Sequence, residues 1–314
     1  MRSFFQFILA IDMGEGDLSF RHSSGNAPRA HDIRWIALSF YIFRLSPGSA
    51  SFNGMTSTLV KYVGLLLASG AIVASQFVQA PTNWTSKTGF AGIPIRYKEV
   101  PVGTCELDPK VKSYSGYADV GENEHMFFWF FEARNQDPVE APLTVWINGG
   151  PGSSSMHGIF SMIGPCKIKH DNVANNPYSW SNASNVLFID QPVTTGFSYT
   201  KPVPAYTDSD LRDIPNAACT DRHHICGTYS WPNASVIANT TAEAAPNFWR
   251  TLQGFMGVFP QYTRHGLHFG TQSYGGHYGP VFSTYIKSQN DLIKTGRLDA
   301  HDIKLESVMI GNGW

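Results

Sequence analysis

Continuous apolar runs in the middle of the chain predict buried β-strands. The runs Met126–Phe131, Leu143–Ile147 and Val186–Ile189 are short and are bounded by polar or Pro-containing segments. Apolar runs of this length without alternation are typical of strands that are covered on both faces. Because only a Pro-containing turn separates Met126–Phe131 from Leu143–Ile147, we expect these two strands to be neighbours in the sheet.

The segment Ala242–Phe259 predicts an amphipathic helix. Its apolar residues recur at spacings of three and four, which places them on one helical face. The residues of this face are Ala245, Phe248, Trp249, Leu252, Phe255 and Met256. We interpret the aromatic stripe as a surface that packs on the core, because amphipathic helices of globular proteins routinely bury such a face.

The last fifty residues continue the alternation of strands and helices. Leu267–Phe269 predicts a short strand that leads into a turn at Ser273, and a helix is expected from near Gly276 to about Ser288. Ile303–Ile310 predicts a final strand. Strands and helices that alternate in this way predict an α/β fold with a mostly parallel sheet.

The N-terminal quarter differs from the rest of the chain. Residues 1–54 show no sustained helical or strand period, so we assign them no fold and expect a disordered or non-native upstream extension. From Met55 a basic residue, an apolar segment at Val63–Ala74 and small residues predict a signal peptide-like segment over 55–75. Its apolar part is shorter than the ~20 residues that span a membrane, so no stable membrane anchor is expected. The enzyme-like domain then covers 76–314.

The composition is consistent with a secreted globular protein. An apolar content of 42% is enough for a full core, and a net charge of −1 gives no electrostatic reason to expect nucleic acid as a partner. Four Asn-x-Ser/Thr sequons follow the signal-like segment, and each is a potential N-glycan site. Their asparagines are Asn83, Asn182, Asn233 and Asn239. We therefore expect the protein to enter the secretory pathway and to be extracellular or vacuolar.

The four cysteines fit the same compartment. Two disulfides can form among Cys105, Cys166, Cys219 and Cys226, and the last two are close enough in sequence to close a small loop. The histidines at 223 and 224 lie in that loop, but the spacing matches no His/Cys zinc template. We interpret the loop as solvated and expect neither a metal nor another cofactor.

Two glycine-containing turns carry the candidate chemistry. Ser273 lies between a predicted strand and a predicted helix and is followed by glycine two residues later, so its hydroxyl can project from a tight turn as a nucleophile. The turn Asn148–Ser155 follows directly on another strand, and unpaired backbone N–H groups of such a turn bind a phosphate or an oxyanion. Phosphate binding is disfavoured because the Lys of a P-loop is absent. Ser273 supplies the nucleophile that an oxyanion hole requires.

Five ordered segments together resemble the signature blocks of the serine carboxypeptidases, especially the secreted fungal members. The segments are Trp146–Ser155, Asn176–Trp180, Asn185–Tyr199, Gln272–Tyr278 and Ile310–Trp314. The likeness runs from about residue 85 to the end of the chain. The resemblance implies an α/β-hydrolase fold, an acidic working range and the release of single residues from the C-termini of peptides or proteins.

The resemblance also implies a role for individual residues. Ser273 matches the nucleophile, and the backbone N–H groups of Gly150 and Tyr274 match the oxyanion hole. Asn148 and the N–H of Gly149 match groups that hold the terminal carboxylate of the substrate.

Two family carboxylic acids that assist in this binding are replaced here by Gln272 and Met162. Since Gln272 donates a hydrogen bond at any pH and Met162 does not, we expect weaker carboxylate binding with a flatter pH dependence. The family's Cys in the Gly-rich block is Ser153 here, which removes one disulfide partner.

The triad Asp and His of the family, its cap insertion and its last strands lie beyond the block at Ile310–Trp314. We therefore expect an incomplete α/β-hydrolase domain, inactive and unstable alone. The nearer histidines, His277 and His301, are not expected to act as the base, because the fold places that residue after the final strand. Two alternatives stay open: a non-catalytic secreted peptide-binding relative, and an esterase or acyltransferase on the same fold.

Overall fold

The computed structural model describes residues 82–207, 213–215, 225–231 and 233–314. The predicted extension 1–54 and the signal-like segment 55–75 lie outside the described residues. Cys219 and the two histidines at 223 and 224 also lie outside them, so the predicted small disulfide loop is not described.

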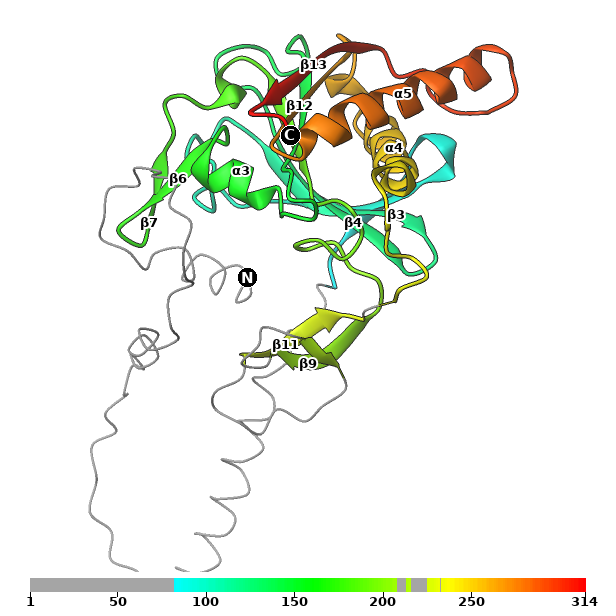
Figure 1. Cartoon of the computed structure of the whole chain (residues 1–314). Coiled ribbons are helices and arrows are strands. Elements are labelled where there is room, and N and C mark those ends of the chain that lie inside the picture. The colour runs from blue at the N-terminus through cyan, green and yellow to red at the C-terminus, as the bar shows by residue number, and fades with distance from the viewer. Residues whose placement is uncertain (1–81, 208–212, 216–224, 232) are drawn as a thin grey trace, which may run out of the picture. The chain divides into compact units, whose positions relative to one another are not determined.

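An eight-stranded sheet forms the centre of the described chain (Figure 1). Its strand order is β1-β2-β3-β4-β8-β5-β12-β13. The strands are β1 (Thr85–Thr88), β2 (Pro94–Glu99), β3 (Ser113–Gly121), β4 (Glu124–Phe131), β5 (Leu143–Ile147), β8 (Asn185–Ile189), β12 (Leu267–Gln272) and β13 (Leu305–Gly311).

The sheet is mixed, and its parallel half carries the two glycine-containing turns. Neighbours from β1 to β8 pair antiparallel, whereas β8, β5, β12 and β13 pair parallel. Following these pairings from strand to strand, only β2 and β4 run against the other six strands. The α/β-hydrolase fold with mostly parallel strands is therefore confirmed.

The expectation that Met126–Phe131 and Leu143–Ile147 are neighbours was wrong. Strand β8 lies between β4 and β5, antiparallel to the first and parallel to the second. The segment after β5 includes helix α3 (Met156–Ser161) and leads the chain back to β8. Hydrophobic runs identify strands but do not encode which strand each one pairs with, because the pairing depends on the crossover connections.

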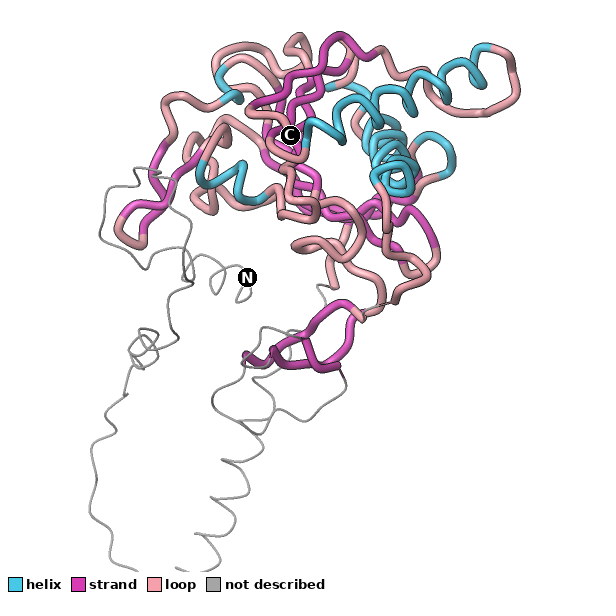
Figure 2. Tube along the Cα trace, viewed as in Figure 1, coloured by secondary structure: helices cyan, strands magenta, loops and turns pink. Residues whose placement is uncertain are grey.

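Two long helices cover one face of the sheet and a short one lies on the other. Helices α4 (Thr241–Val258) and α5 (Gly275–Lys294) pack together beside β3, β12 and β13. Helix α3 lies across the sheet from them, as Figures 1 and 2 show. The predicted helix after Ser273 is thus confirmed, and it continues beyond Ser288 to Lys294. In this extension Ile293 packs against the core cluster, and the Asn290 side chain donates to the Ile303 carbonyl at 2.8 Å.

The aromatic strand β4 separates two core clusters. Phe128 and Phe130 belong to the cluster under α4 and α5, whereas Phe127, Trp129 and Phe131 belong to the cluster on the face of α3. Successive side chains of a strand point to opposite faces, so a run of aromatic residues supplies both cores. The stripe of α4 completes the first cluster, as predicted, with Phe248, Leu252 and Phe255 fully buried.

A capping box begins helix α4. Thr240 is the N-cap, and its hydroxyl accepts a hydrogen bond from the Glu243 N–H at 3.2 Å. The Glu243 carboxylate in turn accepts from the Asn239 N–H at 2.7 Å. The first bond satisfies a backbone donor that the first helical turn leaves free, and the second ties the residue before the N-cap to the same turn. The sequon asparagine Asn239 is exposed directly before this cap.

Two small sheets and three 3₁₀ turns complete the described chain. The first sheet pairs β6 (Cys166–Lys169) with β7 (Asn172–Asn175), and the second has the order β10-β9-β11. Its strands are β9 (Pro202–Thr207), β10 (Asp213–Pro215) and β11 (Ile225–Ser230). The turns are η1 (Phe90–Gly92), η2 (Trp180–Asn182) and η3 (Pro260–Tyr262). None of these elements is predicted from the sequence, because they are too short to show a period.

A disulfide and a buried ion pair fix the face of α3. Cys105 and Cys166 form the disulfide, so the pairing that the sequence left open is settled for these two. Next to Cys105, Glu106 accepts two hydrogen bonds from the Arg134 guanidinium at 2.8 and 3.0 Å. Arg134 also donates to the Pro165 carbonyl, beside Cys166. The covalent and ionic links therefore join the same two segments.

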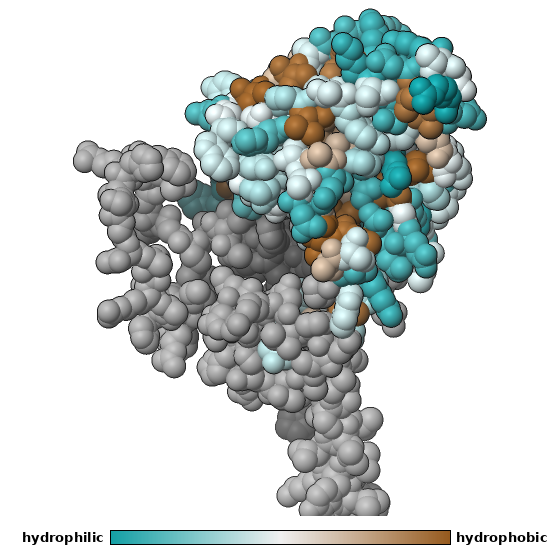
Figure 3. Space-filling model, turned by 45° about the vertical axis from the view of Figure 1, so that its right-hand side comes forward, coloured by the Kyte–Doolittle hydropathy of each residue, from teal (hydrophilic) through white to brown (hydrophobic). Residues whose placement is uncertain are grey.

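The face of the described chain in Figure 3 is largely hydrophilic. In Figure 3 the hydrophobic residues of one face occur in several separate areas among hydrophilic ones. Among the described residues, no helix combines the length and the apolar content that a membrane span requires.

Candidate functional site

Ser273 occupies a strained turn between β12 and α5. Its backbone φ is +56°, in the left-handed region that side chains other than glycine rarely adopt. The turn is held by the Ser273 N–H, which donates to the Gly311 carbonyl at 3.0 Å, and by the Ser273 carbonyl, which accepts from the Gly276 N–H at 2.9 Å. The strain and the exposed side chain are what a nucleophile elbow requires.

The glycines after Ser273 allow this turn to close. A Cβ added at Gly275 would lie 2.1 Å from Thr271 Oγ1, and one added at Gly276 would lie 2.3 Å from the Trp314 carbonyl oxygen. Neither distance is compatible with a side chain. The sequence predicted a small residue at 275, and the structure adds the second position, where the neighbouring chain passes.

The Gly-rich turn lies directly beside the nucleophile. Strands β5 and β12 pair parallel with Ile147 opposite Thr271, so both turns leave the sheet at the same carboxyl edge. A Cβ added at Gly149 would lie 2.5 Å from the Gln272 carbonyl oxygen and 2.6 Å from the Tyr274 nitrogen. The structure thus brings together Gly149, Gln272, Ser273 and Tyr274.

Gly150 begins a tight turn that leaves backbone N–H groups accessible. Its φ is +112°, and the turn is closed by the Ser153 N–H, which donates to the Gly149 carbonyl at 3.1 Å. Gly150 is exposed, whereas Gly149 is buried. An exposed backbone turn next to a serine nucleophile is an arrangement that stabilises an oxyanion.

The side chain of Asn148 is oriented by its neighbours. Its Oδ1 accepts a hydrogen bond from the indole of Trp146 at 2.6 Å, and its backbone N–H donates to Ser155 Oγ at 3.1 Å. Because the indole N–H can only donate, the other end of the amide is its NH₂ group. This NH₂ group makes no hydrogen bond to another described residue, so it is available as a donor to a ligand.

The two residues that replace the family's acids lie in different surroundings. Gln272 is the last residue of β12, partly exposed, and its carbonyl faces Gly149. Met162 follows α3 and packs against the core cluster on that face. Met162 has therefore become part of the apolar packing, whereas Gln272 keeps a polar side chain next to the nucleophile.

Neither candidate histidine is bonded to Ser273. Among the described residues the Ser273 hydroxyl has no hydrogen-bond partner. The His277 ring stacks on Tyr274 at 4.6 Å, one helical turn after the nucleophile. His301 precedes β13 and therefore lies at the amino edge of the parallel strands, opposite to Ser273.

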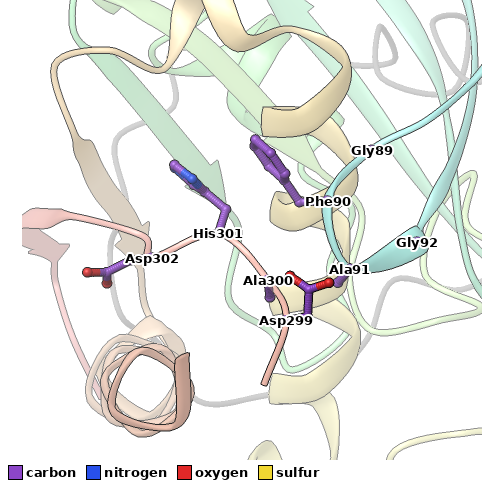
Figure 4. A pocket seen from close by; sticks show the side chains of 8 residues that line it. All are labelled: Gly89, Phe90, Ala91, Gly92, Asp299, Ala300, His301 and Asp302. Carbon is purple, nitrogen blue, oxygen red and sulfur yellow. The ribbon is translucent and has the colours of Figure 1, made fainter. Parts of the chain in front are cut away.

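His301 belongs to a separate hollow of about 510 Å³. Figure 4 shows its ring next to that of Phe90, and the two rings stack at 4.7 Å. The hollow is lined by the turn Gly89–Gly92 and by 299–302. Burial lowers the pKa of His301 from 6.5. This hollow lies at the opposite edge of the sheet from Ser273. We therefore keep the candidate site at Ser273 although the hollow is large.

Asp190 is a buried acidic residue beside this site that was not among the predicted site residues. It follows β8, is fully buried and accepts hydrogen bonds from Ser154 Oγ at 2.8 Å and from the N–H of Ser155 at 2.7 Å. A third donor is the N–H of Phe197 at 2.8 Å. Burial raises the pKa of Asp190 from 3.8 to about 6, although these donors oppose the shift. The available signal was an acidic residue directly after an apolar strand.

No metal site accompanies this arrangement in the part of the chain that the structure describes. There, no group of three or more His, Cys, Asp or Glu side chains is placed to hold a metal ion. The residues gathered around Ser273 are a hydroxyl, amides and backbone N–H groups, which suit an anionic ligand.

Comparisons with known proteins show the family of the chain. The sequence model described as serine carboxypeptidase matches residues 102–314. Carboxypeptidase S1 of Penicillium janthinellum is 40% identical over 214 residues, and the match covers 68% of this chain and 42% of that protein. Carboxypeptidase S1 homolog A of Arthroderma otae is 39% identical over 246 residues, covering 70% of this chain and 37% of that protein.

A solved structure is also similar. The prohormone-processing carboxypeptidase Kex1(delta)p of Saccharomyces cerevisiae aligns with a TM-score of 0.48 and 25% identity, covering 71% of this chain and 39% of that one. The chain thus spans about two fifths of the length of the curated relatives it matches. The family model alone covers more than half of the 314 residues. The chain belongs to the serine carboxypeptidase family.

Proposed function

We propose that this protein is a serine-type carboxypeptidase that releases C-terminal residues from peptides through an acyl-enzyme at Ser273. The observation that carries the proposal is the contact between the two turns. Gly149 lies against the backbone of the nucleophile turn, so a group held at Asn148 or Gly149 is held at a fixed short distance from Ser273. An exopeptidase requires such a fixed distance between the substrate carboxylate and the scissile carbonyl.

The chemical step uses the exposed hydroxyl of Ser273. Its oxygen attacks the carbonyl carbon of the last peptide bond while its proton passes to a general base. The negative charge on the carbonyl oxygen is stabilised by the N–H groups of Gly150 and Tyr274. Collapse of the intermediate breaks the C–N bond, and the amine takes the proton as it leaves. Water then hydrolyses the ester at Ser273 and restores the hydroxyl.

The substrate carboxylate is held by neutral donors. The NH₂ group of Asn148 and the N–H of Gly149 are the donors, and the Gln272 amide adds a third. These donors keep their hydrogen atoms at every pH of interest, in contrast to carboxylic acids. Backbone and amide N–H groups can bind the C-terminal carboxylate of a peptide without a buried cation.

The reaction requires a general base and a carboxylate that orients it. Among the described residues no histidine contacts the Ser273 hydroxyl. No described histidine is therefore assigned as the base. Ser273→Ala should lower the rate of peptide hydrolysis by about a thousandfold or more, and a variant that keeps the parent's rate would contradict the assignment of the nucleophile.

The remaining expectations follow from the same proposal. The protein enters the secretory pathway, to the extracellular space or the vacuole, and Asn83, Asn182, Asn233 and Asn239 are the candidate glycan sites. Asn83 and Asn239 are exposed, and Asn182 and Asn233 are partly exposed. Mass spectrometry of the secreted protein before and after removal of N-glycans tests all four.

The decisive test of function compares two ligands that differ at one end. A short peptide with a free C-terminal carboxylate is compared with the same peptide as its C-terminal amide. A carboxypeptidase site prefers the free acid, because only the acid presents an anion to Asn148 and Gly149. Equal binding of the two peptides contradicts the proposal.

The two peptides together with a fluorophosphonate probe distinguish the two alternatives. A fluorophosphonate probe labels Ser273 when the hydroxyl is activated. Preference for the free acid without labelling favours a non-catalytic peptide-binding relative. Labelling without such a preference favours an esterase or acyltransferase on the same fold.

A further inference from the structure

We propose that Asp190 is a positioning residue that holds the carboxylate-binding turn in place from beneath. This inference rests on the proposed function, because it assigns a role in the binding of the substrate carboxylate. Asp190 touches no group that would contact a substrate. It acts through the residues that leave Asn148 and Gly149 facing the nucleophile.

A continuous series of hydrogen bonds runs from Asp190 to Asn148. The Asp190 carboxylate accepts from the Ser155 N–H at 2.7 Å. The hydroxyl of the same Ser155 accepts from the Asn148 N–H at 3.1 Å and donates to the Ile189 carbonyl at 2.6 Å. The carboxyl end of β8 thus fixes the residue that follows β5, where the turn begins.

A second hydrogen bond to the Asp190 carboxylate holds the later part of the turn. Ser154 Oγ donates to Asp190 at 2.8 Å and lies in the segment that follows Gly150 and Gly152. Both ends of the turn are therefore linked to Asp190. Asn148, at the start of the turn, is linked through Ser155, and the end of the turn is linked through Ser154. Without these ties, the glycines would leave the turn free to change its backbone conformation.

The loop after Asp190 closes over the carboxylate from the other side. The Phe197 N–H donates to it at 2.8 Å, and a Cβ added at Gly196 would lie 2.2 Å from its Oδ2. The Ser198 hydroxyl donates to the Asp190 carbonyl at 2.6 Å and accepts from the Phe127 N–H. The carboxylate thus accepts hydrogen bonds from two loops, the one after β5 and the one after β8. Ser198 links the second loop to β4.

Stability does not explain this group. A buried carboxylate whose pKa is raised disfavours folding at neutral pH, when it must be ionised. Asp190 makes no ion pair with any described residue that would offset the cost of burial. A residue that reduces stability while orienting a candidate site is typical of functional positions.

The test measures the preference for a free carboxylate, which a purely structural defect does not change. Dissociation constants are measured for a short peptide and for its C-terminal amide, at about neutral pH where Asp190 is ionised. The 314-residue chain carries Ser273→Ala throughout, so that no peptide is hydrolysed. The quantity compared between variants is the ratio of the two constants, since a loss of folded protein lowers both affinities equally.

Three variants are compared with that parent. Asp190→Asn keeps the shape but faces an NH₂ group toward a donor, and we expect it to lower the preference about tenfold, as loss of a hydrogen bond to a charged group does. Ser154→Ala removes one bond without changing the buried charge, and about a threefold loss is expected. Glu132→Gln is the matched control, because Glu132 is a buried carboxylate that also accepts a backbone N–H and a hydroxyl, from Lys112 and Tyr262.

Glu132 follows β4, which runs against β8, so it lies at the edge of the sheet opposite to Asp190. Its variant is expected to keep the parent's preference within about twofold. An unchanged preference in folded Asp190→Asn overturns the inference but leaves the proposed function standing. If Asp190→Asn does not fold, an unchanged preference in Ser154→Ala overturns it instead. A parent that binds acid and amide equally overturns both.

Discussion

Gly149 packs directly against Ser273: a Cβ added at Gly149 would lie 3.1 Å from the Cβ of Ser273 and 2.6 Å from the Tyr274 nitrogen. The contact joins the end of β5 to the end of β12 and sets the spacing between the proposed carboxylate-binding turn and the proposed nucleophile. Only glycine permits it, because the atoms that a side chain would meet belong largely to the backbone.

Gly149→Ala is therefore expected to reduce the free energy of unfolding by about 2 kcal/mol, the usual cost of overpacking a rigid site. Chemical denaturation measures the change. Gly311→Ala is the matched control, since its Cβ would meet Gln272 and Thr271 only at 3.8 Å and 3.9 Å, within ordinary contact. It should stay within about 0.5 kcal/mol of the parent. Equal stability of the two variants would show that the turns yield easily.

Asp190 predicts a specific dependence of stability on pH. Its pKa is raised by burial from 3.8 to about 6, so the folded state binds this proton more tightly than the unfolded state does. The stabilising contribution is present below about pH 4 and is lost as the pH rises through about 6. From this group alone the free energy of unfolding should fall by roughly 3 kcal/mol across that window.

Denaturation at several pH values, for the parent and Asp190→Asn, checks this expectation. The variant has no proton to lose at this site, so its curve should be flatter between about pH 4 and 7. Asp119 does not interfere: burial acts to raise its pKa, but hydrogen bonds from the Arg96 guanidinium and His125 outweigh this and hold the pKa below its ordinary value, which confines its effect to more acidic solutions. Parallel curves for parent and variant would refute the raised pKa.

Removing one partner of the buried ion pair between Arg134 and Glu106 should greatly reduce the free energy of unfolding. Their side chains are 9% and 3% exposed, and Arg134 also donates to the Pro165 and Asn176 carbonyls. Arg134→Met leaves the Glu106 charge buried without its partner, and about 3–5 kcal/mol of stability should be lost. Thermal or chemical denaturation is the measurement.

The surface pair Lys294 and Asp302 provides the contrast. Its side chains are 62% and 45% exposed and 3.6 Å apart. Because water screens such a pair, Lys294→Met should change stability by less than about 1 kcal/mol. A loss at Arg134 no larger than that at Lys294 would show that the buried charge finds other partners or water.

The Cys105–Cys166 disulfide closes a loop with a sequence separation of 61 residues. In the chain-entropy account, a cross-link of that span stabilises the folded state by roughly 4 kcal/mol. The double variant Cys105→Ser, Cys166→Ser should lose an amount of this order. Comparison of parent and variant under non-reducing conditions tests it, and a loss below about 1 kcal/mol would contradict the account.

The Gln272 side chain does not titrate, so we expect it to add no pH dependence to the affinity for the substrate carboxylate. A neutral amide donates at every pH, whereas Gln272→Glu introduces an acid that ionises and repels the substrate carboxylate. The ratio of peptide affinities, parent over variant, should rise between about pH 4 and 8. The ratio also removes any pH dependence that both proteins share, such as that of Asp190. A constant ratio would place the Gln272 side chain away from the bound carboxylate.

The sequence by itself determined the family and most of the main strands and helices, and it proposed the site residues. Apolar runs became β4, β5, β8 and β12 because buried strands must exclude water along their whole length. The glycines around Ser273 signalled a tight turn because only glycine tolerates such crowding. These features are local, so neighbouring residues suffice to reveal them.

Only the tertiary structure decided which distant segments meet. It inserted β8 between β4 and β5, paired Cys105 with Cys166 and placed Gly149 against Ser273. It also made Asp190, an acidic residue after an apolar run, the acceptor that joins two loops. Such contacts depend on crossover connections and on the packing of both faces of a sheet, and neither leaves a period in the sequence.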